Sequence, residues 1–333
     1  MTDPVASLRV MDISVIIVNW NSQAYLERCL ESFAQAPSSR SVEIIVVDNG
    51  STDGSPEIVE ARFPHVRLIR NRENLGFARA NNMAIRESRG RYVSLVNSDV
   101  EVLPGCLDAL ADFLDQHPDV GNVGPRILYP NRTLQSSCRR FPTLWNNFCS
   151  ASGLATLFPG SRIFCGEHML YFRYDRTLPV DVLVGCFWMM RQEAVEAVGF
   201  LDEDFFIYGE DVDWCRRCRK SGWQVVFFPG AEAIHHRAAS SAANPVRFAV
   251  LQQQSVLRYW AKHHGLPARL AIRCILAFHH FTRYLLGAAF RNTLSRRRKR
   301  SALRVQMDLA CLRALFSAGA SYQARTTVER SAS

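Results

Sequence analysis

The stretch ISVIIVNW, residues 13–20, decides the fold class, because its branched apolar residues form a nearly continuous run. Such runs are typical of strands that are buried on both faces of a parallel sheet. The next segment, residues 22–36, places Leu26, Leu30 and Phe33 on one face of a predicted helix. A buried strand followed at once by an amphipathic helix is the unit from which α/β sheets are built.

The same strand-then-helix pattern returns three more times, which predicts a doubly wound α/β half. The further strands are VEIIVVDNGS (42–51), VRLIRN (66–71) and RYVSLVNSDV (91–100), and the helices are 54–62, 77–88 and a segment from Pro104 to 117. Beyond a polar connection (129–180) we expect a buried strand at 180–190, a helix up to Gly199, the helical stretch YGEDVDWCRRC (208–218) and a strand at 223–229.

Length and charge divide the chain into two unequal parts. A chain of 333 residues with 48% hydrophobic residues is long enough for one large domain and an appendage. Residues 1–244 hold 24 Lys and Arg against 29 Asp and Glu, whereas residues 245–333 hold 16 against 2. We therefore predict an α/β domain over 1–244 and a basic helical extension over 245–333, to which any partner chosen by charge belongs.

The cysteines and the N-terminus favour a cytoplasmic location. The ten cysteines follow no regular pairing, and Cys29, Cys106 and Cys186 lie inside apolar segments, as reduced thiols do. The N-terminal residues show no basic start followed by an apolar core and a cleavage site, so we expect no signal peptide.

The C-terminal extension has two interpretations. Helical patterns cover 245–263 and 267–290, followed by RRRKR (296–300), one more short helix and a polar tail. A basic stripe in the second helix is formed by Arg269, Arg273, His280, Arg283 and Arg291. The stripe and RRRKR are typical of a helix lying in a membrane interface, although a helix packed on the α/β domain with a solvated basic face is the alternative. Nucleic-acid binding is not expected, because no recognition module accompanies the charge.

Polar residues follow the predicted strands, where ligands bind in α/β sheets. Asp48 ends the second strand and is suited to accept hydrogen bonds from a base or ribose. Asn97, Ser98 and Asp99 end the fourth strand and offer oxygen ligands to Mg²⁺ or Mn²⁺ holding a diphosphate. The segment ENLGFARANN (73–82) suits a sugar or phosphate at a helix start. Taken singly, such residues are usually turn formers.

The stretch YGEDVDWCRRC also admits several interpretations. Cys215 and Cys218 form a lone C-x-x-C without a second pair, which favours core packing over zinc. Asp213 lies three and four residues before Arg216 and Arg217, a spacing that indicates helix ion pairs. Glu210 and Asp211 start the helix, where acids are favoured by the helix dipole as well as by catalysis.

Taken together, the motifs resemble the family 2 inverting glycosyltransferases of the GT-A fold, and within them the rhamnosyltransferase-like branch. The matching motifs are VIIVNWNS, VVDNGSTDGS, NLGFARANN, VNSDV, GFLDEDFFIYGEDVDWCRR and AIHHRAASS, which span roughly residues 13–241. One departure is that the acidic motif contains Asn97, Ser98 and Asp99 rather than Asp-x-Asp, which leaves one carboxylate ligand.

The resemblance implies a role for each matching residue. It implies that Asp211 is the catalytic base and that Glu210 orients the acceptor or a basic partner. It implies that Asp99 and His235 ligate a divalent metal, Mn²⁺ or Mg²⁺, with His236 as the alternative histidine. The implied nucleotide-sugar site consists of Asn19, Trp20, Asn21, Asp48, Asn49, Asn74, Gly76, Asn82, Asn97 and Ser98.

The implied function is transfer of L-rhamnose from dTDP-rhamnose to a lipid-linked or cell-envelope glycan, by an enzyme on the inner face of the cell membrane. A UDP-hexose donor is the runner-up. A nucleotidyltransferase would not explain a base in the sequence GED, and a non-enzymatic scaffold with a degenerate transferase domain would not explain the intact Asp48, Asp99 and Asp211.

Overall fold

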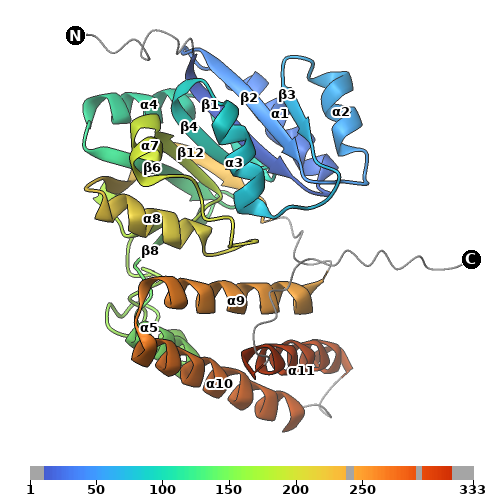
Figure 1. The fold of residues 1–333 in the computed structure, drawn as a ribbon, viewed down its shortest axis with the longest axis vertical. Coiled ribbons are helices and arrows are strands. Elements are labelled where there is room, and N and C mark those ends of the chain that lie inside the picture. Colours follow the sequence, from blue (N-terminus) through green and yellow to red (C-terminus); the bar gives the residue numbers. More distant parts are fainter. Residues whose placement is uncertain (1–10, 238–243, 290–294, 317–333) are drawn as a thin grey trace, which may run out of the picture.

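A mixed sheet with helices on both faces forms the centre of the molecule (Figure 1). The structure, a computed structural model, describes residues 11–237, 244–289 and 295–316. The strand order is β3-β2-β1-β4-β11-β6-β12-β5. The strands of this order are β1 (Met11–Asn19), β2 (Val42–Asp48), β3 (Arg67–Arg70), β4 (Gly90–Asn97), β5 (Val100–Val102), β6 (Val120–Leu128), β11 (Phe187–Arg191) and β12 (Gln224–His235).

Strands β3, β2, β1 and β4 run parallel, as the repeated strand-then-helix pattern predicted. β11 is antiparallel to β4 and β6, β12 is parallel to β6, and β5 is antiparallel to β12. Asn19 pairs with Asp48, and Val18 pairs with Asn97. The polar residues that end β1, β2 and β4 are therefore in register at the carboxyl ends of these parallel strands.

The apolar run of β1 is buried because helices cover both faces of the sheet. Ile13, Val15 and Ile17 pack with apolar residues of α1 (Gln23–Gln35) and α4 (Cys106–Gln116). Ile16 lies on the opposite face, in a cluster with residues of α3 (Phe77–Glu87), α7 (Gln192–Val198) and α8 (Glu210–Lys220). The small helix α2 (Ser55–Arg62) packs beside α1.

The sequence pattern did not predict β6, and it treated residues 129–180 as a connection only. Gly121 and Gly124 interrupt the apolar run of β6 because the side chains of Trp223 and Leu183 lie against them; an added Cβ would approach these side chains to 2.8 and 2.9 Å. The connection contains short elements: β7 (Leu134–Gln135), β8 (Cys138–Arg139), α5 (Leu144–Ser152), α6 (Leu154–Leu157) and β9 (Leu178–Pro179), with β10 (Val182–Leu183) directly after it.

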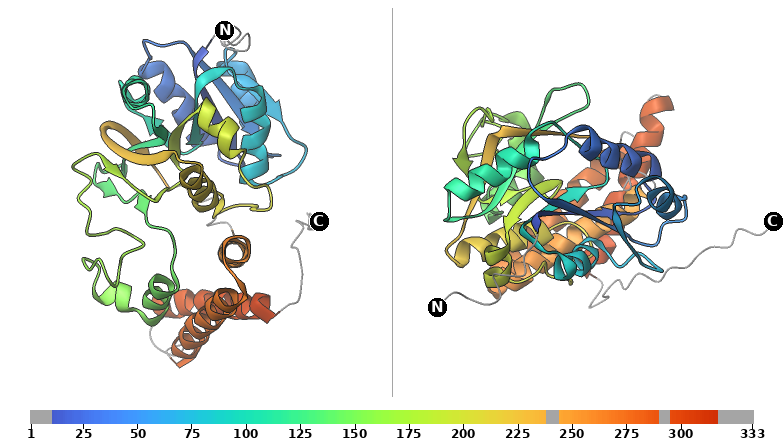
Figure 2. Two further views of the ribbon diagram at one scale, coloured as in Figure 1. Left: turned by 60° about the vertical axis from the view of Figure 1, so that its left-hand side comes forward. Right: turned by 90° about the horizontal axis from the view of Figure 1, so that it is seen from above.

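Three C-terminal helices lie at the end of the molecule away from the parallel strands (Figures 1 and 2). They are α9 (Pro245–His263), α10 (Leu266–Ala289) and α11 (Ser295–Phe316). The first two match the prediction closely, but the third spans 22 residues and is not short. Phe205, Tyr259, Trp260 and Ile272 form a small core that joins α9 and α10 to the α/β domain. Within the described residues, no helix combines the length and apolar character needed to cross a membrane.

The predicted basic stripe of α10 contacts α11. Arg273 donates to the carbonyl oxygen of Leu315 at 2.9 Å, and His280 and Arg283 lie 2.9 and 3.5 Å from the carboxylate of Asp308. Arg291 and the side chains of 296–300 lie outside the described residues. Much of the stripe therefore contacts α11, which neither interpretation expected.

Candidate active site

The ends of β1 and β2 form a hydrogen-bonded corner around Asp48. One Asp48 carboxylate oxygen accepts from the Asn19 amide at 3.3 Å, and the other accepts from the backbone N–H of Ser51 at 2.9 Å. Asn19 is fully buried, and its Oδ1 has no partner among the described residues. Asn21, in a left-handed conformation, donates its N–H to the Ser51 hydroxyl at 2.9 Å. The half-buried Trp20 precedes it, so all four predicted residues lie at this corner.

Asn49 fixes the loop that precedes α3. Its amide nitrogen donates to the Asn74 side chain at 3.0 Å and to the Gly76 carbonyl at 3.2 Å. Its amide oxygen accepts from Asn71 and from the Leu75 N–H at 3.1 and 3.0 Å. Because these bonds occupy all of its donors and acceptors, Asn49 contributes to the site by holding this loop in place.

Gly76 and Asn82 connect this loop and α3 to the segment that precedes α8. A Cβ on Gly76, whose φ is +89°, would lie 2.6 Å from the carbonyl oxygen of Phe206, so only glycine allows this approach. The Asn82 amide donates to the Leu201 carbonyl at 2.8 Å and accepts from the Leu201 N–H at 3.0 Å. Both predicted residues therefore position the 201–206 segment.

Asp99 and His235 lie together at the ends of β4 and β12. The Nε2 atom of His235 is 3.2 Å from Oδ1 of Asp99. The other ring nitrogen, Nδ1, is 2.6 Å from Oε1 of Gln135, an oxygen that only accepts. A proton on Nδ1 would satisfy this contact and leave Nε2, which faces Asp99, available to coordinate a metal, as in metal-binding histidines.

The structure distinguishes the two adjacent histidines. His236 Nε2 lies 2.7 Å from Oε1 of Glu101, and its ring packs beside Tyr25 with centroids 5.5 Å apart. His236 therefore faces the start of β5, whereas His235 faces Asp99. Of the two candidates, His235 is the one placed to bind a metal with Asp99.

Asp211 begins α8 beside the chain that joins β10 and β11. Its Oδ1 accepts from the N–H of Val212 at 2.8 Å, and its Oδ2 accepts from the N–H of Gly185 at 3.3 Å. Burial raises the pKa of Asp211, although these N–H groups and the charge of Arg139 oppose the increase. Burial and the charge of Asp211 hold the pKa of Glu210 well above its ordinary value.

The dipeptide Gly185–Cys186 connects the carboxylate of Asp211 with the acidic motif that begins at Asn97. Gly185 binds the carboxylate of Asp211, while the carbonyl of Cys186 accepts from the N–H of Asn97 at 2.9 Å. These two hydrogen bonds and the span of one dipeptide limit the distance between Asp211 Oδ2 and Asn97 N to about 12 Å. A nucleotide sugar lying across the strand ends can therefore reach both the acidic motif and the carboxylate of Asp211.

The other residues of YGEDVDWCRRC serve the core and the contact with α9. Cys215 and Cys218 are fully buried, and all ten cysteines are free, as core packing predicted. Asp213 is fully buried and pairs with Arg217, as its spacing predicted, and also with Lys262 and His263, at 2.8, 2.8 and 2.7 Å. Arg216 instead contacts the Tyr259 hydroxyl at 2.6 Å.

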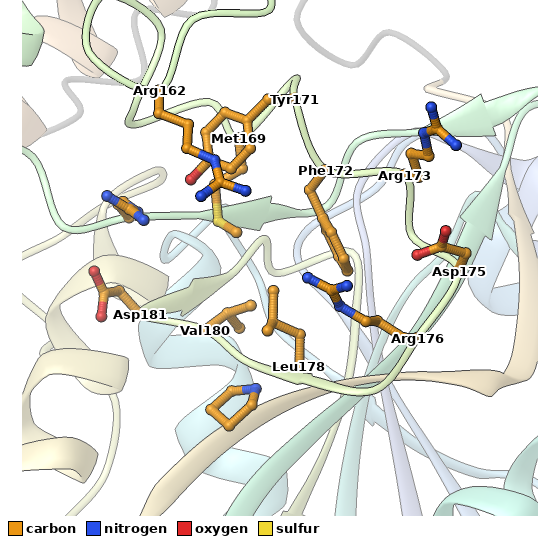
Figure 3. Close-up of a pocket in the computed structure, with 12 residues that line it drawn as sticks. Arg162, Met169, Tyr171, Phe172, Arg173, Asp175, Arg176, Leu178, Val180 and Asp181 are labelled. Carbon is orange, nitrogen blue, oxygen red and sulfur yellow. The ribbon is translucent and has the colours of Figure 1, made fainter.

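Sequence reasoning missed Gln135, Arg139 and Gly185. Gln135 and Arg139 come from the connection, where no helical or strand period indicates their position. Gly185 instead lies within the strand predicted at 180–190, which the structure divides into β10 and β11. The same connection lines a cavity of about 560 Å³ (Figure 3), near the Leu178–Phe227 pairing and away from the strand ends. Its wall includes Arg162 and Arg176, whose guanidinium groups point inward in Figure 3. The cavity is thus separate from the Asp99 and Asp211 site.

Comparison with known proteins places these features in a family. The model of the family "Glycosyl transferase family 2" matches residues 14–199. The N-acetylglucosaminyl-diphospho-decaprenol L-rhamnosyltransferase of Mycobacterium tuberculosis is 32% identical over 306 residues, which cover 86% of this chain and 96% of that protein. The low-salt glycan biosynthesis hexosyltransferase Agl10 of Haloferax volcanii is 28% identical over 68% of this chain and 67% of that protein.

The fold is shared with solved glycosyltransferases. The mannosyltransferase PcManGT from Pyrobaculum calidifontis, in complex with GDP-Man and Mn²⁺, superposes with a TM-score of 0.56 at 17% identity. The match covers 93% of this chain and 88% of that one. At this identity the likeness is one of fold, and it agrees with the mixed sheet described above.

Proposed function

Because this chain belongs to glycosyl transferase family 2, we propose that it transfers L-rhamnose from dTDP-rhamnose to a lipid-linked glycan acceptor, with inversion. The class of enzyme, a glycosyltransferase of the GT-A fold, follows from the family and the fold. The choice of rhamnose and of a diphosphate-linked lipid acceptor is supported by the mycobacterial relative, which this chain matches over nearly the whole of that protein. A UDP-hexose donor is the second candidate, supported by the hexosyltransferase relative.

The observation that carries the proposal is the position of Asp211 relative to the acidic motif. The catalytic step needs a base on one side of the donor sugar and a diphosphate site on the other. The hydrogen bonds of Gly185 with Asp211 and of Cys186 with Asn97 hold these two groups near one dipeptide, which supports such an arrangement. A scaffold protein would not require a half-buried carboxylate at this position, with a pKa raised by burial.

In the proposed reaction, a hydroxyl oxygen of the acceptor attacks the anomeric carbon of the donor sugar. The hydroxyl proton passes to the carboxylate of Asp211 as the new carbon–oxygen bond forms. The bond from the anomeric carbon to the nucleoside diphosphate breaks, and the electron pair leaves with the diphosphate. Attack from the face opposite the leaving group inverts the configuration. Glu210, whose Oε2 is buried without a partner among the described residues, is proposed to orient the acceptor.

The pair Asp99 and His235 supports a divalent metal, although the described residues contain no group of three or more His, Cys, Asp or Glu side chains placed to hold one. Carboxylate and imidazole ligands suit Mn²⁺, and Gln135 holds the His235 ring in the tautomer that ligation needs. The buried Oδ1 of Asn97 is also unpartnered within the described residues. Asp99 and His235 would hold Mn²⁺ or Mg²⁺, with the donor diphosphate completing the ligands. The bound metal would supply positive charge that stabilises the departing nucleoside diphosphate.

Metal-dependent nucleotide binding tests this assignment. We expect dTDP, or UDP for the second candidate, to raise the thermal unfolding midpoint in the presence of Mn²⁺ and not in EDTA. Asp99→Ala and His235→Ala should lose this effect, whereas His236→Ala should keep it, because His236 faces Glu101. A missing shift with every nucleotide and metal would contradict the transferase function, and an equal loss in His236→Ala would contradict the assignment of His235.

A panel of nucleotide sugars identifies the donor. Turnover is measured as nucleoside diphosphate released in the presence of a diphosphate-linked lipid sugar. We expect dTDP-rhamnose to give the highest kcat/KM; a higher value for a UDP-hexose would favour the second candidate. Because the proposed acceptor is lipid-linked, we propose that the enzyme acts peripherally at the cytoplasmic face of the membrane.

A further inference from the structure

Helix α10 presents a row of exposed apolar side chains to solvent. Its exposed large hydrophobic members have between 47% and 62% of their surface accessible. Successive members are three or four residues apart, so they share one face of the helix. We call this row the apolar stripe; its members are Leu266, Leu270, Cys274, Phe278, Phe281 and Leu285.

Other residues of α10 contact the neighbouring helices. Ile272 is fully buried against Tyr259 and Trp260 of α9. Arg273 and His280 contact α11. Within the part of the chain that the structure describes, α9 and α11 therefore leave the apolar stripe exposed.

A second group of exposed apolar side chains lies on the α5–α6 segment. The group consists of Trp145, Phe148, Leu157, Phe158 and Ile163, which are 48%, 40%, 72%, 50% and 65% exposed. α10 packs against α5. Figures 1 and 2 place α5 and α10 together at the end of the molecule away from the parallel strands. We call the two groups together, which lie on elements that pack against each other, the apolar end face.

The segments that form this end face are basic in sequence. Helix α10 contains Arg269, Arg273 and Arg283 and no Asp or Glu. Residues 143–166 contain no Asp or Glu either, and their single charged residue is Arg162, next to the exposed Ile163. A partner for this face must therefore be apolar at the centre and anionic around it.

We propose that the apolar end face, formed by the apolar stripe and the α5–α6 group, docks on the interface of an anionic lipid bilayer. Leucine and aromatic side chains enter the boundary between head groups and acyl chains, and the basic residues around them face lipid phosphates. A second copy of the chain fits less well, because two such faces would bring their positive charges together. The inference rests on the proposed lipid-linked acceptor for its purpose, since docking brings the enzyme to that acceptor.

Cys274 provides a reporter within the apolar stripe. It is the exposed cysteine among the ten, and the other nine are buried. An environment-sensitive maleimide dye on Cys274 of the full-length protein should shift its emission to the blue when vesicles of phosphatidylglycerol and phosphatidylcholine are added. Vesicles of phosphatidylcholine alone should give a weaker response at equal lipid concentration. An unchanged spectrum with both kinds of vesicle would overturn the proposal.

Unlabelled variants test the contribution of the stripe. In sedimentation with anionic vesicles, F278S/F281S should bind about tenfold or more weakly than the wild type, because two phenyl rings no longer leave water. Phe200→Ser, which removes a ring of 40% exposure between α7 and α8, is the matched control and should bind normally. Wild-type binding by F278S/F281S would overturn the proposal, as would a stable dimer in light scattering whose formation protects Cys274 from labelling.

The vesicle assays separate this inference from the proposed function. They need neither donor nor turnover, so an inactive protein that binds vesicles through the stripe would contradict only the glycosyl transfer. Conversely, a protein that glycosylates a water-soluble acceptor but ignores anionic vesicles would contradict only the docking face.

Discussion

Two aspartates at the start of α8 have opposite environments, although two positions separate them. Asp211 faces the carboxyl edge of the sheet, accepts hydrogen bonds from backbone N–H groups, and has a pKa raised by burial. Asp213 faces α9 and is also buried, but Lys262, Arg217 and His263 outweigh the effect of burial and lower its pKa. The same helix turn therefore presents one acid suited to take up a proton and one suited to stay charged.

The largest expected effect is on catalysis at Asp211. Asp211→Asn keeps the shape of the side chain but removes the proton acceptor, so kcat should fall about a thousandfold while dTDP binding remains. The release of nucleoside diphosphate measures turnover, and the metal-dependent thermal shift measures binding. If turnover persists near the wild-type rate, the base lies elsewhere and the contrast between the two aspartates has no catalytic meaning.

The next effect is on stability at Asp213. Asp213→Ala leaves Arg217, Lys262 and His263 without their shared carboxylate, which should reduce the free energy of unfolding by about 3 kcal/mol. Asp204→Ala is the control, because it also removes an ion pair to α9, with Arg258, but Asp204 is 71% exposed. That variant should lose less than about 1 kcal/mol in the same urea titration. Equal losses of unfolding free energy in the two variants would show that burial does not strengthen the ion pairs of Asp213.

The smallest expected effect is on the pH dependence of activity and stability. Asp211 must be ionised to act, so kcat/KM should rise with pH through a pKa above the ordinary aspartate value of about 3.9. The raised pKa of Asp211 favours the folded state below about pH 3.9, and this contribution is lost as pH rises through the raised pKa. The lowered pKa of Asp213 favours the folded state above about pH 3.9, and that contribution is lost as pH falls through the lowered pKa.

Profiles of kcat/KM and of the unfolding midpoint against pH measure both effects. Asp211→Asn should raise the midpoint near neutral pH, because a buried charge is removed, whereas Asp213→Asn should lower it there. An acid limb of kcat/KM at or below about pH 4 would contradict the environment described for Asp211.

The sequence predicted the parts of the site that lie at strand ends. Asp48 and Asp99 directly follow apolar runs, and parallel strands bring such ends to one edge of a sheet, so their proximity followed from local pattern. Gln135 and Arg139 could not be found in this way, because two-residue strands have no measurable period. Their position depends on the pairing of β7 with β6 and of β8 with β10.

The extension shows a different limit of sequence reasoning. The sequence placed α9 and α10 correctly and identified the basic residues of α10. It could not show that Arg273 and His280 contact α11 while the apolar stripe stays exposed, because an amphipathic pattern does not say which face is covered. Only the packing of α9, α11 and α5 around α10 settles this.

The ion pairs of Asp213 also determine whether the α/β part can be produced as a stable fragment without α9. Lys262 and His263 belong to α9. A chain that ends before Pro245 would therefore leave Asp213 with Arg217 alone in place of three basic partners. We therefore expect the α/β part to be a poor module by itself. Chimaeras that exchange these helices between related enzymes should carry α8 and α9 across as one unit.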